Sequence, residues 1–378
     1  MRPPRVLVRR AVMDPLWIPL ALLLAGVFVV VAVTGVVVAP LARRRRVSRL
    51  ALFGALYMLL DACLVVCCGC LWLRYPLASR RGDRWIDLHT SLLRRALSLL
   101  VAVSRPLFGF RVQVEEMPAA QSLTGRPLLV LARHGGPGDS FAIAELLLSR
   151  CGRRPVIVLK ESLRWDPCID LLLTRLRSCF LPARGAGRDL PALIGDAARR
   201  LVDDEAILLF PEGGNWTPSR YRNALARLWA RGRRAAAARA AANPHVLPPQ
   251  PAGMLACLAA RPDLEVVLVA HTGLDDLVTP AQIWAALPVS GRPMVMRWWH
   301  LPAADRPIEA ELQQDWLDVQ WAVLDSWIDA RKAARQRAEA SSVAVSAQAV
   351  QAVEAVQAAD AEPAAESEPA ADATAGQG

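Results

Sequence analysis

A histidine and an aspartate lie five positions apart in a glycine-rich stretch of this chain. Residues 131–140 are Leu-Ala-Arg-His-Gly-Gly-Pro-Gly-Asp-Ser, which places the imidazole of His134 near the carboxylate of Asp139. A carboxylate close to a histidine can fix its tautomer and raise its basicity, as a general base requires. The alternative interpretation is a structural connector whose aspartate caps the following helix.

A second polar motif follows another apolar run. Residues 206–210 are Ala-Ile-Leu-Leu-Phe, and Pro-Glu-Gly-Gly comes next, with Glu212 and Gly213 at its centre. Glycines let an anionic head group approach the backbone N–H groups, and the later Arg220 and Arg222 are cations suited to phosphate. Alone this motif could be an ordinary turn, but beside the first motif it indicates a site.

Both motifs need strands to present them, and the apolar runs before them are typical of buried strands. A strand-to-helix turn presents its side chains at the rim of a sheet, where α/β folds place their chemistry. Strands and helices alternate after residue 110, which predicts an α/β fold, a sheet with flanking helices. The predicted strands are 110–115, 127–132, 155–160, 206–210 and 265–270. The predicted helices are 84–103, 140–150, 166–177, 189–203, 220–242 and 308–330.

The first 80 residues contain two long apolar segments, at about 15–40 and 50–73. Each is long enough to cross a bilayer, and the first is too long for a cleaved signal peptide. We therefore expect an N-terminal membrane hairpin. The arginines outside the hairpin outnumber those of its loop, which favours both ends in the cytoplasm. A shallow element at the membrane surface is the alternative.

The formal net charge is +10, and almost all the positive charge is arginine, since Lys160 and Lys332 are the two lysines. This composition suits an anionic phospholipid surface. No Cys/His finger or RNA-binding aromatic pattern accompanies it, so we expect no nucleic-acid partner. Four of the eight cysteines lie in the second apolar segment, where thiols behave as small hydrophobic side chains. The predicted catalytic region covers 84–330, and the Ala/Glu-rich residues 333–378 predict a disordered tail.

The two motifs resemble those of the glycerolipid acyltransferase family, whose members acylate lysophosphatidic acid and related lysophospholipids. His134 and Asp139 match its His-x4-Asp block, and the residues from Phe210 to Gly213 match its Phe-Pro-Glu-Gly block. Lys160 at a strand end, the segment 180–184 that ends in Arg184, and the late apolar strand 264–270 match further blocks. The resemblance covers about residues 105–300. Arg133 and Gly136 stand where many members have Asn and Ser, which we expect to alter the acceptor pocket.

The resemblance implies an acyltransferase of the 1-acylglycerol-3-phosphate type in phospholipid synthesis or remodelling. His134 would take the proton of an acceptor hydroxyl and Asp139 would orient the ring, while acyl-CoA or acyl carrier protein serves as co-substrate. The resemblance calls for no cofactor and no metal, and with the hairpin it implies an integral protein of the cell membrane facing the cytoplasm. The residues that it assigns to substrate binding are Lys160, Arg184, Glu212, Gly213 and Arg220.

Three other interpretations of the sequence stay open. The first is a serine esterase that uses Ser140 of Gly-Asp-Ser, although that family needs a late Asp-x-x-His pair that this chain lacks. The second is a membrane-anchored, lipid-binding scaffold with an inactive acyltransferase fold, against which the intact His134, Asp139 and Glu212 argue. The third is a metal site in residues 271–276, although a loop with one histidine and two carboxylates is more often solvated.

Overall fold

The chain folds into two compact units, residues 1–329 and 330–378. The computed structural model describes residues 3–37, 42–80, 82–118, 123, 125–136, 138–183, 187–275, 277–289 and 291–360. The first unit contains a sheet and the helices that cover it. The second unit contains, in its described part, the later residues of one long helix.

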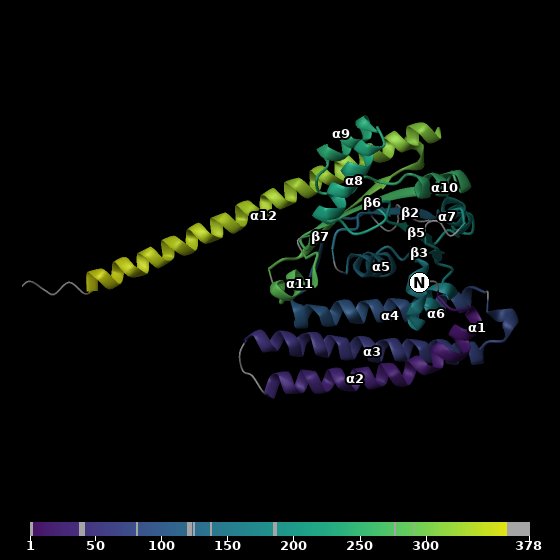
Figure 1. The fold of residues 1–378 in the computed structure, drawn as a ribbon, viewed down its shortest axis with the longest axis horizontal. Coiled ribbons are helices and arrows are strands. Elements are labelled where there is room, and N and C mark those ends of the chain that lie inside the picture. The colour runs from purple at the N-terminus through teal and green to yellow at the C-terminus, as the bar shows by residue number, and fades with distance from the viewer. Residues whose placement is uncertain are drawn as a thin grey trace, which may run out of the picture. The chain divides into compact units, whose positions relative to one another are not determined.

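A seven-stranded sheet forms the centre of the first unit, as far as the described residues go (Figure 1). Its order is β1-β7-β6-β2-β5-β3-β4. The five strands from β6 to β4 are parallel, whereas β7 is antiparallel to β6 and β1 is parallel to β7. The strands are β1 Val112–Glu116, β2 Leu128–Ala132, β3 Arg154–Lys160, β4 Cys179–Leu181, β5 Glu205–Leu209, β6 Glu265–Thr272 and β7 Met294–Leu301. The predicted α/β class is therefore confirmed.

Helices surround this sheet and connect its strands. The N-terminal helices are α1 Val6–Val8, α2 Asp14–Val37, α3 Ala42–Arg74 and α4 Asp83–Phe108, with a π-helical turn at Arg9–Met13 between α1 and α2. The helices among the strands are α5 Asp139–Ser149, α6 Pro167–Arg175, α7 Leu190–Arg199, α8 Pro218–Ala230, α9 Arg234–Ala242, α10 Ala252–Ala260 and α11 Pro280–Ala286. The last helix is α12 Ala310–Asp360, and short 3-10 turns lie at Leu77–Ser79, Glu161–Trp165 and Ala303–Asp305.

The sheet is covered on both faces because its central strands are apolar on both sides. Leu129 and Leu131 of β2 pack with side chains of α7, α10 and the first part of α12. Leu128 and Val130, which alternate with them, pack with side chains of α5. Continuous apolar runs are typical of parallel strands buried on both faces. Burial of these runs fixes the register of β2 and therefore the position of the turn that follows it.

The N-terminal helices form a further layer beyond α5. Side chains of α4 pack against α5 and α6, and α3 contributes the buried Cys68 to the same cluster. Two arginines before α2 reach the α/β layer: Arg9 Nε lies 2.9 Å and Arg10 Nη2 lies 3.0 Å from the buried carboxylate of Asp170 in α6. The start of the apolar hairpin is thus ion-paired to the α/β layer.

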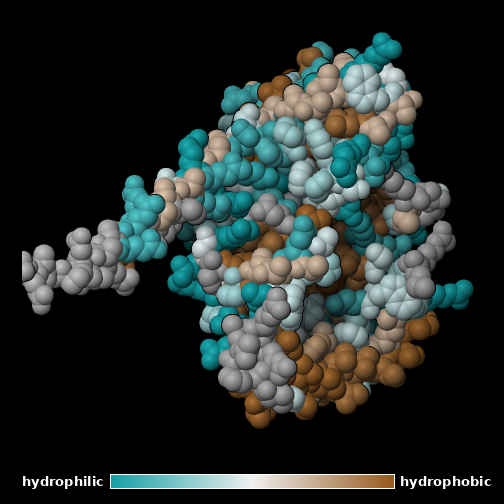
Figure 2. All heavy atoms as spheres, turned by 60° about the vertical axis from the view of Figure 1, so that its left-hand side comes forward, coloured by the Kyte–Doolittle hydropathy of each residue, from teal (hydrophilic) through white to brown (hydrophobic). Residues whose placement is uncertain are grey.

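Two helices of the described chain are long and apolar enough to cross a membrane, Val6–Val37 and Arg45–Arg74. The exposed side chains of α2 are mostly valine and leucine. Figure 2 shows the resulting band of hydrophobic atoms along the base of the molecule, where Figure 1 places α2 and α3. Their length and composition are consistent with the predicted hairpin.

The structure differs from the sequence-based expectation at two helices. The predicted helix 220–242 is two helices, α8 and α9, because Gly232 between them adopts a left-handed φ of 69°. The tail from residue 333 was predicted to be disordered, whereas the structure has α12 continuing to Asp360. Alanine, glutamine, glutamate and arginine have high helix propensities, which explains how this stretch forms a helix without aromatic side chains. Residues 361–378 lie outside the described part.

Candidate active site

The carboxyl ends of the parallel strands bring the two sequence motifs together. Leu131 of β2 pairs with Leu209 of β5, and Ala132 of β2 pairs with Val269 of β6. The turns after β2 and β5 therefore lie side by side at one edge of the sheet, as α/β folds arrange their sites. A backbone hydrogen bond joins the two turns, in which Trp216 N donates to His134 O at 2.6 Å.

His134 and Asp139 form a hydrogen-bonded pair in the first of these turns. Nδ1 of His134 lies 2.8 Å from Oδ2 of Asp139, which is the first residue of α5. The same carboxylate oxygen accepts a hydrogen bond from Gly135 N at 3.0 Å, and Oδ1 accepts one from Ser140 N at 2.5 Å. The His134 side chain remains 23% exposed. An imidazole held through Nδ1 presents its Nε2 for proton transfer.

The charge of Asp139 is stabilised by its partners. Burial alone would raise the pKa of this carboxyl, but the hydrogen bonds from His134 and His271 hold it well below its usual range. An ionised carboxylate next to an imidazole favours the imidazolium that forms when the histidine accepts a proton. This geometry is consistent with the predicted roles of a general base and its orienting carboxylate.

His271 is a third member of this cluster. It lies near the end of β6, it is buried, and its Nε2 is 3.4 Å from Asp139 Oδ2 and 3.1 Å from the backbone oxygen of Arg133. The sequence offered His271 as part of a metal loop, but its imidazole contacts Asp139, and Asp275 is ion-paired to Arg133. Asp276 lies outside the described residues. The sequence did not predict the contact of His271 with Asp139, because it depends on the pairing of β6 with β2, which brings His271 next to the His134 turn.

Arg133 is buried beneath the catalytic turn. Its Nη1 donates to the carboxylate of Asp275 and, at 2.7 Å, to the backbone oxygen of His271, and its Nη2 donates to the backbone oxygen of His245 at 2.9 Å. A Cβ atom at Gly135 would collide with the same guanidinium, which explains the glycine there. Arg133 does not line the cavity that contains His134, because its side chain is fully buried, so its effect on the acceptor pocket stays a prediction.

His134 lines a cavity of about 1510 Å³ in the first unit. Cationic side chains of Lys160, Arg188 and Arg220 line one part of it. Leucines of α3 and α4, among them Leu64 and Leu97, line another part. Lys160 makes no hydrogen bond or ion pair with another described residue. The cavity therefore combines a base, unpaired positive charge and a large apolar wall, which suits an anionic amphiphile.

Four of the residues predicted for the site, His134, Lys160, Gly213 and Arg220, line this cavity. Arg184 lies outside the described residues. Arg188, which the sequence reasoning missed, lines the cavity from the loop after β4. Its positive charge in this loop was the one feature of the sequence that could have indicated it. Gly213 has a φ of 68°, and a Cβ atom there would lie 2.7 Å from Nε2 of Gln250, so the turn requires glycine.

Glu212 does not line the cavity that contains His134. Its side chain is buried and faces a second pocket. Burial raises the pKa of Glu212 to about 8, although the positive charge of Arg133 opposes this effect. The carboxyl is therefore mostly protonated at neutral pH.

We expect Glu212→Gln to gain stability relative to the unchanged protein as the pH rises from about 5 to about 8. In this window the folded protein keeps the proton of Glu212, whereas the unfolded chain releases it, so the stability of the unchanged protein falls with rising pH. Glutamine is neutral throughout and lacks this loss. Thermal unfolding followed by tryptophan fluorescence measures the difference in Tm. A difference that stays constant over this range would show that Glu212 is ionised in the folded protein.

Comparisons with known proteins gave one family match and one structural match. Residues 111–249, which contain both turns, match the family model described as Acyltransferase. Through residues 111–249 the chain is similar to the Acyltransferase family, which supports the predicted resemblance to the glycerolipid acyltransferases. No curated protein matches it. Among solved structures it is similar to the 1-acyl-sn-glycerophosphate (LPA) acyltransferase PlsC from Thermotoga maritima, with 14% identity and a TM-score of 0.48, over 76% of this chain and 98% of that chain.

Proposed function

We propose that this protein transfers a fatty acyl group from acyl-CoA or acyl carrier protein to the hydroxyl of a lysophospholipid, with 1-acyl-glycerol 3-phosphate as the preferred acceptor. The observation that carries this proposal is the hydrogen-bonded pair of His134 and Asp139 beside a cavity with both cationic and apolar walls. A lysophospholipid offers a hydroxyl, a phosphate and an alkyl chain, which match these three features.

In the proposed reaction, Nε2 of His134 removes the proton of the acceptor hydroxyl while its oxygen attacks the thioester carbonyl. The C–O bond forms, the C–S bond breaks, and the proton passes from the imidazolium to the leaving thiolate. Asp139 keeps the ring oriented through Nδ1. Lys160, Arg188 and Arg220 bind the acceptor phosphate, with Arg184 as a further candidate from the sequence. The reaction calls for no cofactor or metal beyond the acyl donor.

The apolar wall of the cavity indicates how the alkyl chain is accommodated. Leu60 and Leu64 belong to α3, one of the two helices that are long and apolar enough to cross a membrane. We propose an integral protein of the cell membrane, whose lipid substrate reaches His134 along α3. The ion pairs of Arg9 and Arg10 with Asp170 keep the N-terminal arginines beside the α/β layer. This supports a cytoplasmic position for the N-terminal segment and for the α/β layer.

A serine esterase remains the alternative enzyme, and one contact argues against it. Oγ of Ser140 donates to Oδ1 of Asp139 at 3.0 Å, so its proton is directed to a carboxylate instead of an imidazole. A hydrolytic serine needs an adjacent base to become a nucleophile. An inactive lipid-binding scaffold is the non-enzymatic alternative, and the hydrogen-bonded His134 and Asp139 argue against it.

The proposed function is tested with purified full-length protein, oleoyl-CoA and a panel of acceptors. Release of free thiol should depend on a lysophospholipid, and lysophosphatidic acid should exceed lysophosphatidylcholine about tenfold or more in kcat/KM, because charge-assisted hydrogen bonds to the exposed phosphate are each worth about 1.5–3 kcal/mol. Glycerol 3-phosphate should be a poor acceptor because it lacks the alkyl chain. Release of free fatty acid without an acceptor would favour the esterase, and no thiol release with any acceptor would contradict the proposal.

A further inference from the structure

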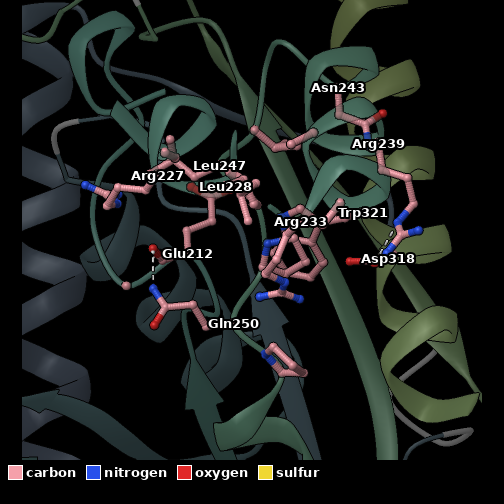
Figure 3. A pocket seen from close by; sticks show the side chains of 18 of the residues that line it. Glu212, Arg227, Leu228, Arg233, Arg239, Asn243, Leu247, Gln250, Asp318 and Trp321 are labelled. Carbon is pink, nitrogen blue, oxygen red and sulfur yellow. Dashed lines mark hydrogen bonds and ion pairs between the residues drawn. The ribbon is translucent and has the colours of Figure 1, made fainter. Parts of the chain in front are cut away.

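A second pocket of about 640 Å³ lies between α8, α9 and the first part of α12. Five of the described residues that line it are arginines: Arg220, Arg227, Arg231, Arg233 and Arg239. Figure 3 shows Arg227 on the left of this pocket, on the same side as Glu212 and Gln250, and Arg233 and Arg239 to the right. We call it the arginine pocket. The division of residues 220–242 into two helices at Gly232 creates it, since α8 and α9 each supply part of the wall.

Most of the positive charge in the arginine pocket is not balanced by described residues. Arg239 is ion-paired to Asp318, with Nε and Oδ2 3.0 Å apart, and Arg220 donates to the backbone oxygen of Asn215 at 2.9 Å. The guanidinium groups of Arg227, Arg231 and Arg233 make no hydrogen bond or ion pair with another described residue. The other acid in the wall, Glu212, is buried, and its raised pKa leaves it mostly neutral. Several unpaired guanidinium groups around one hollow favour a polyanion.

The arginine pocket adjoins the cavity that contains His134. Gly213, Gly214, Arg220 and Gln250 line both hollows. A single ligand can therefore place an anionic part among the arginines and a reacting end near His134. The side chains of Gln250 and Arg220 lie against these two glycines, so all four residues form the wall that the two hollows share.

We propose that the arginine pocket binds the phosphates of the acyl donor acyl-CoA, with the pantetheine arm passing along the shared wall, beside Arg220 and Gln250, to bring the thioester to His134. This inference rests on the proposed acyl transfer and names its donor. The 3′-phosphate and the diphosphate of CoA supply several negative charges, which match the unpaired arginines better than the single phosphate of a lysophospholipid does.

The five arginines of the pocket are exposed, and the small side chains of Ala224, Ala236 and Ala240 line it with them. The pocket therefore has room for a nucleotide among its arginines, and transfer assays with acyl carrier protein test the other donor. Lys160 and Arg188 line the cavity but not the arginine pocket, so they remain for the acceptor phosphate.

The test is to measure the binding of CoA to the full-length protein in detergent by calorimetry. We expect the triple change Arg227→Gln, Arg231→Gln and Arg233→Gln to weaken CoA binding about 100-fold. Each lost charge-assisted contact is worth up to about tenfold in affinity. Arg234→Gln is the matched control, because Arg234 neighbours Arg233 on α9 but lines neither hollow. It should change the affinity less than about threefold. Dephospho-CoA should bind the unchanged protein more weakly than CoA, and pantetheine should bind more weakly still.

Kinetics separate the donor site from an acceptor site. The triple variant should raise the KM for oleoyl-CoA and leave the KM for lysophosphatidic acid unchanged. A rise in the acceptor KM alone, or loss of transfer from acyl carrier protein alone, would overturn the proposal. If the triple variant does not fold, competition on the unchanged protein decides: adenosine 3′,5′-bisphosphate should displace CoA, and failure to displace it refutes the site.

The same measurements distinguish this inference from the proposed function. CoA binding that depends on these arginines, in a protein that acylates no lysophospholipid, would leave the nucleotide site standing and refute the function. Normal acyl transfer from oleoyl-CoA by the triple variant would leave the function standing and refute the arginine pocket as the donor site.

Discussion

Replacing His134 with alanine is expected to reduce the rate of acyl transfer by about 10³-fold or more, while the protein remains in the membrane fraction. A positioned general base contributes roughly 10²–10⁴-fold, and His134 is the imidazole that lines the cavity with Nδ1 fixed by Asp139. Alanine removes the base but leaves α2, α3 and the cavity in place. Thiol release from oleoyl-CoA with lysophosphatidic acid, measured beside a sedimentation assay, gives both quantities.

Two further variants show whether the loss belongs to acid–base chemistry. Asp139→Asn should also lower kcat strongly, since an amide cannot stabilise the imidazolium, and the protein should still bind the acceptor. Ser140→Ala should retain activity within about tenfold, because it removes one hydrogen bond to Asp139 and no proposed nucleophile. An inactive Ser140→Ala variant together with an active His134→Ala variant would refute the proposed mechanism and favour a serine enzyme.

The sequence predicted the parts of this site that depend on local patterns. Apolar runs marked β2, β3, β5 and β6, and the glycine-rich turn after β2 marked His134 and Asp139, because residues five positions apart on one strand-to-helix turn must lie close together. The strand order was not predictable from such runs. It is the order that brings His271 from β6 to the carboxylate of Asp139.

The direction of a side chain was the other quantity that the sequence did not supply. Glu212 follows Phe210 closely, yet it lines the arginine pocket and not the cavity that contains His134. The arginine pocket itself depends on the left-handed turn at Gly232, which the helical pattern of residues 220–242 concealed. In α12, helix propensity outweighed the polar composition from which a disordered tail was expected.

Replacing Arg133 with leucine is expected to have the largest effect on stability. Its guanidinium is fully buried and ion-paired to Asp275, which is itself buried. Removal of one partner from a buried ion pair leaves an uncompensated charge and costs about 3–5 kcal/mol. For a domain of this size such a loss lowers Tm by roughly 10 °C. Tryptophan fluorescence during heating of the purified protein measures it.

The double variant Arg133→Leu with Asp275→Asn identifies the cause of this loss. If the unpaired carboxylate of Asp275 is responsible, making it neutral should recover part of the lost Tm, so the two changes should be less than additive. The residual loss then belongs to the carbonyl oxygens of His271 and His245, which would lack their donor.

The kinetic expectation follows from the same geometry: because Arg133 does not line the cavity, preference among lysophospholipids should not change in any variant that folds. A stable Arg133→Leu protein with altered acceptor preference would show instead that this arginine faces the lipid, and that its burial under the turn does not hold in solution.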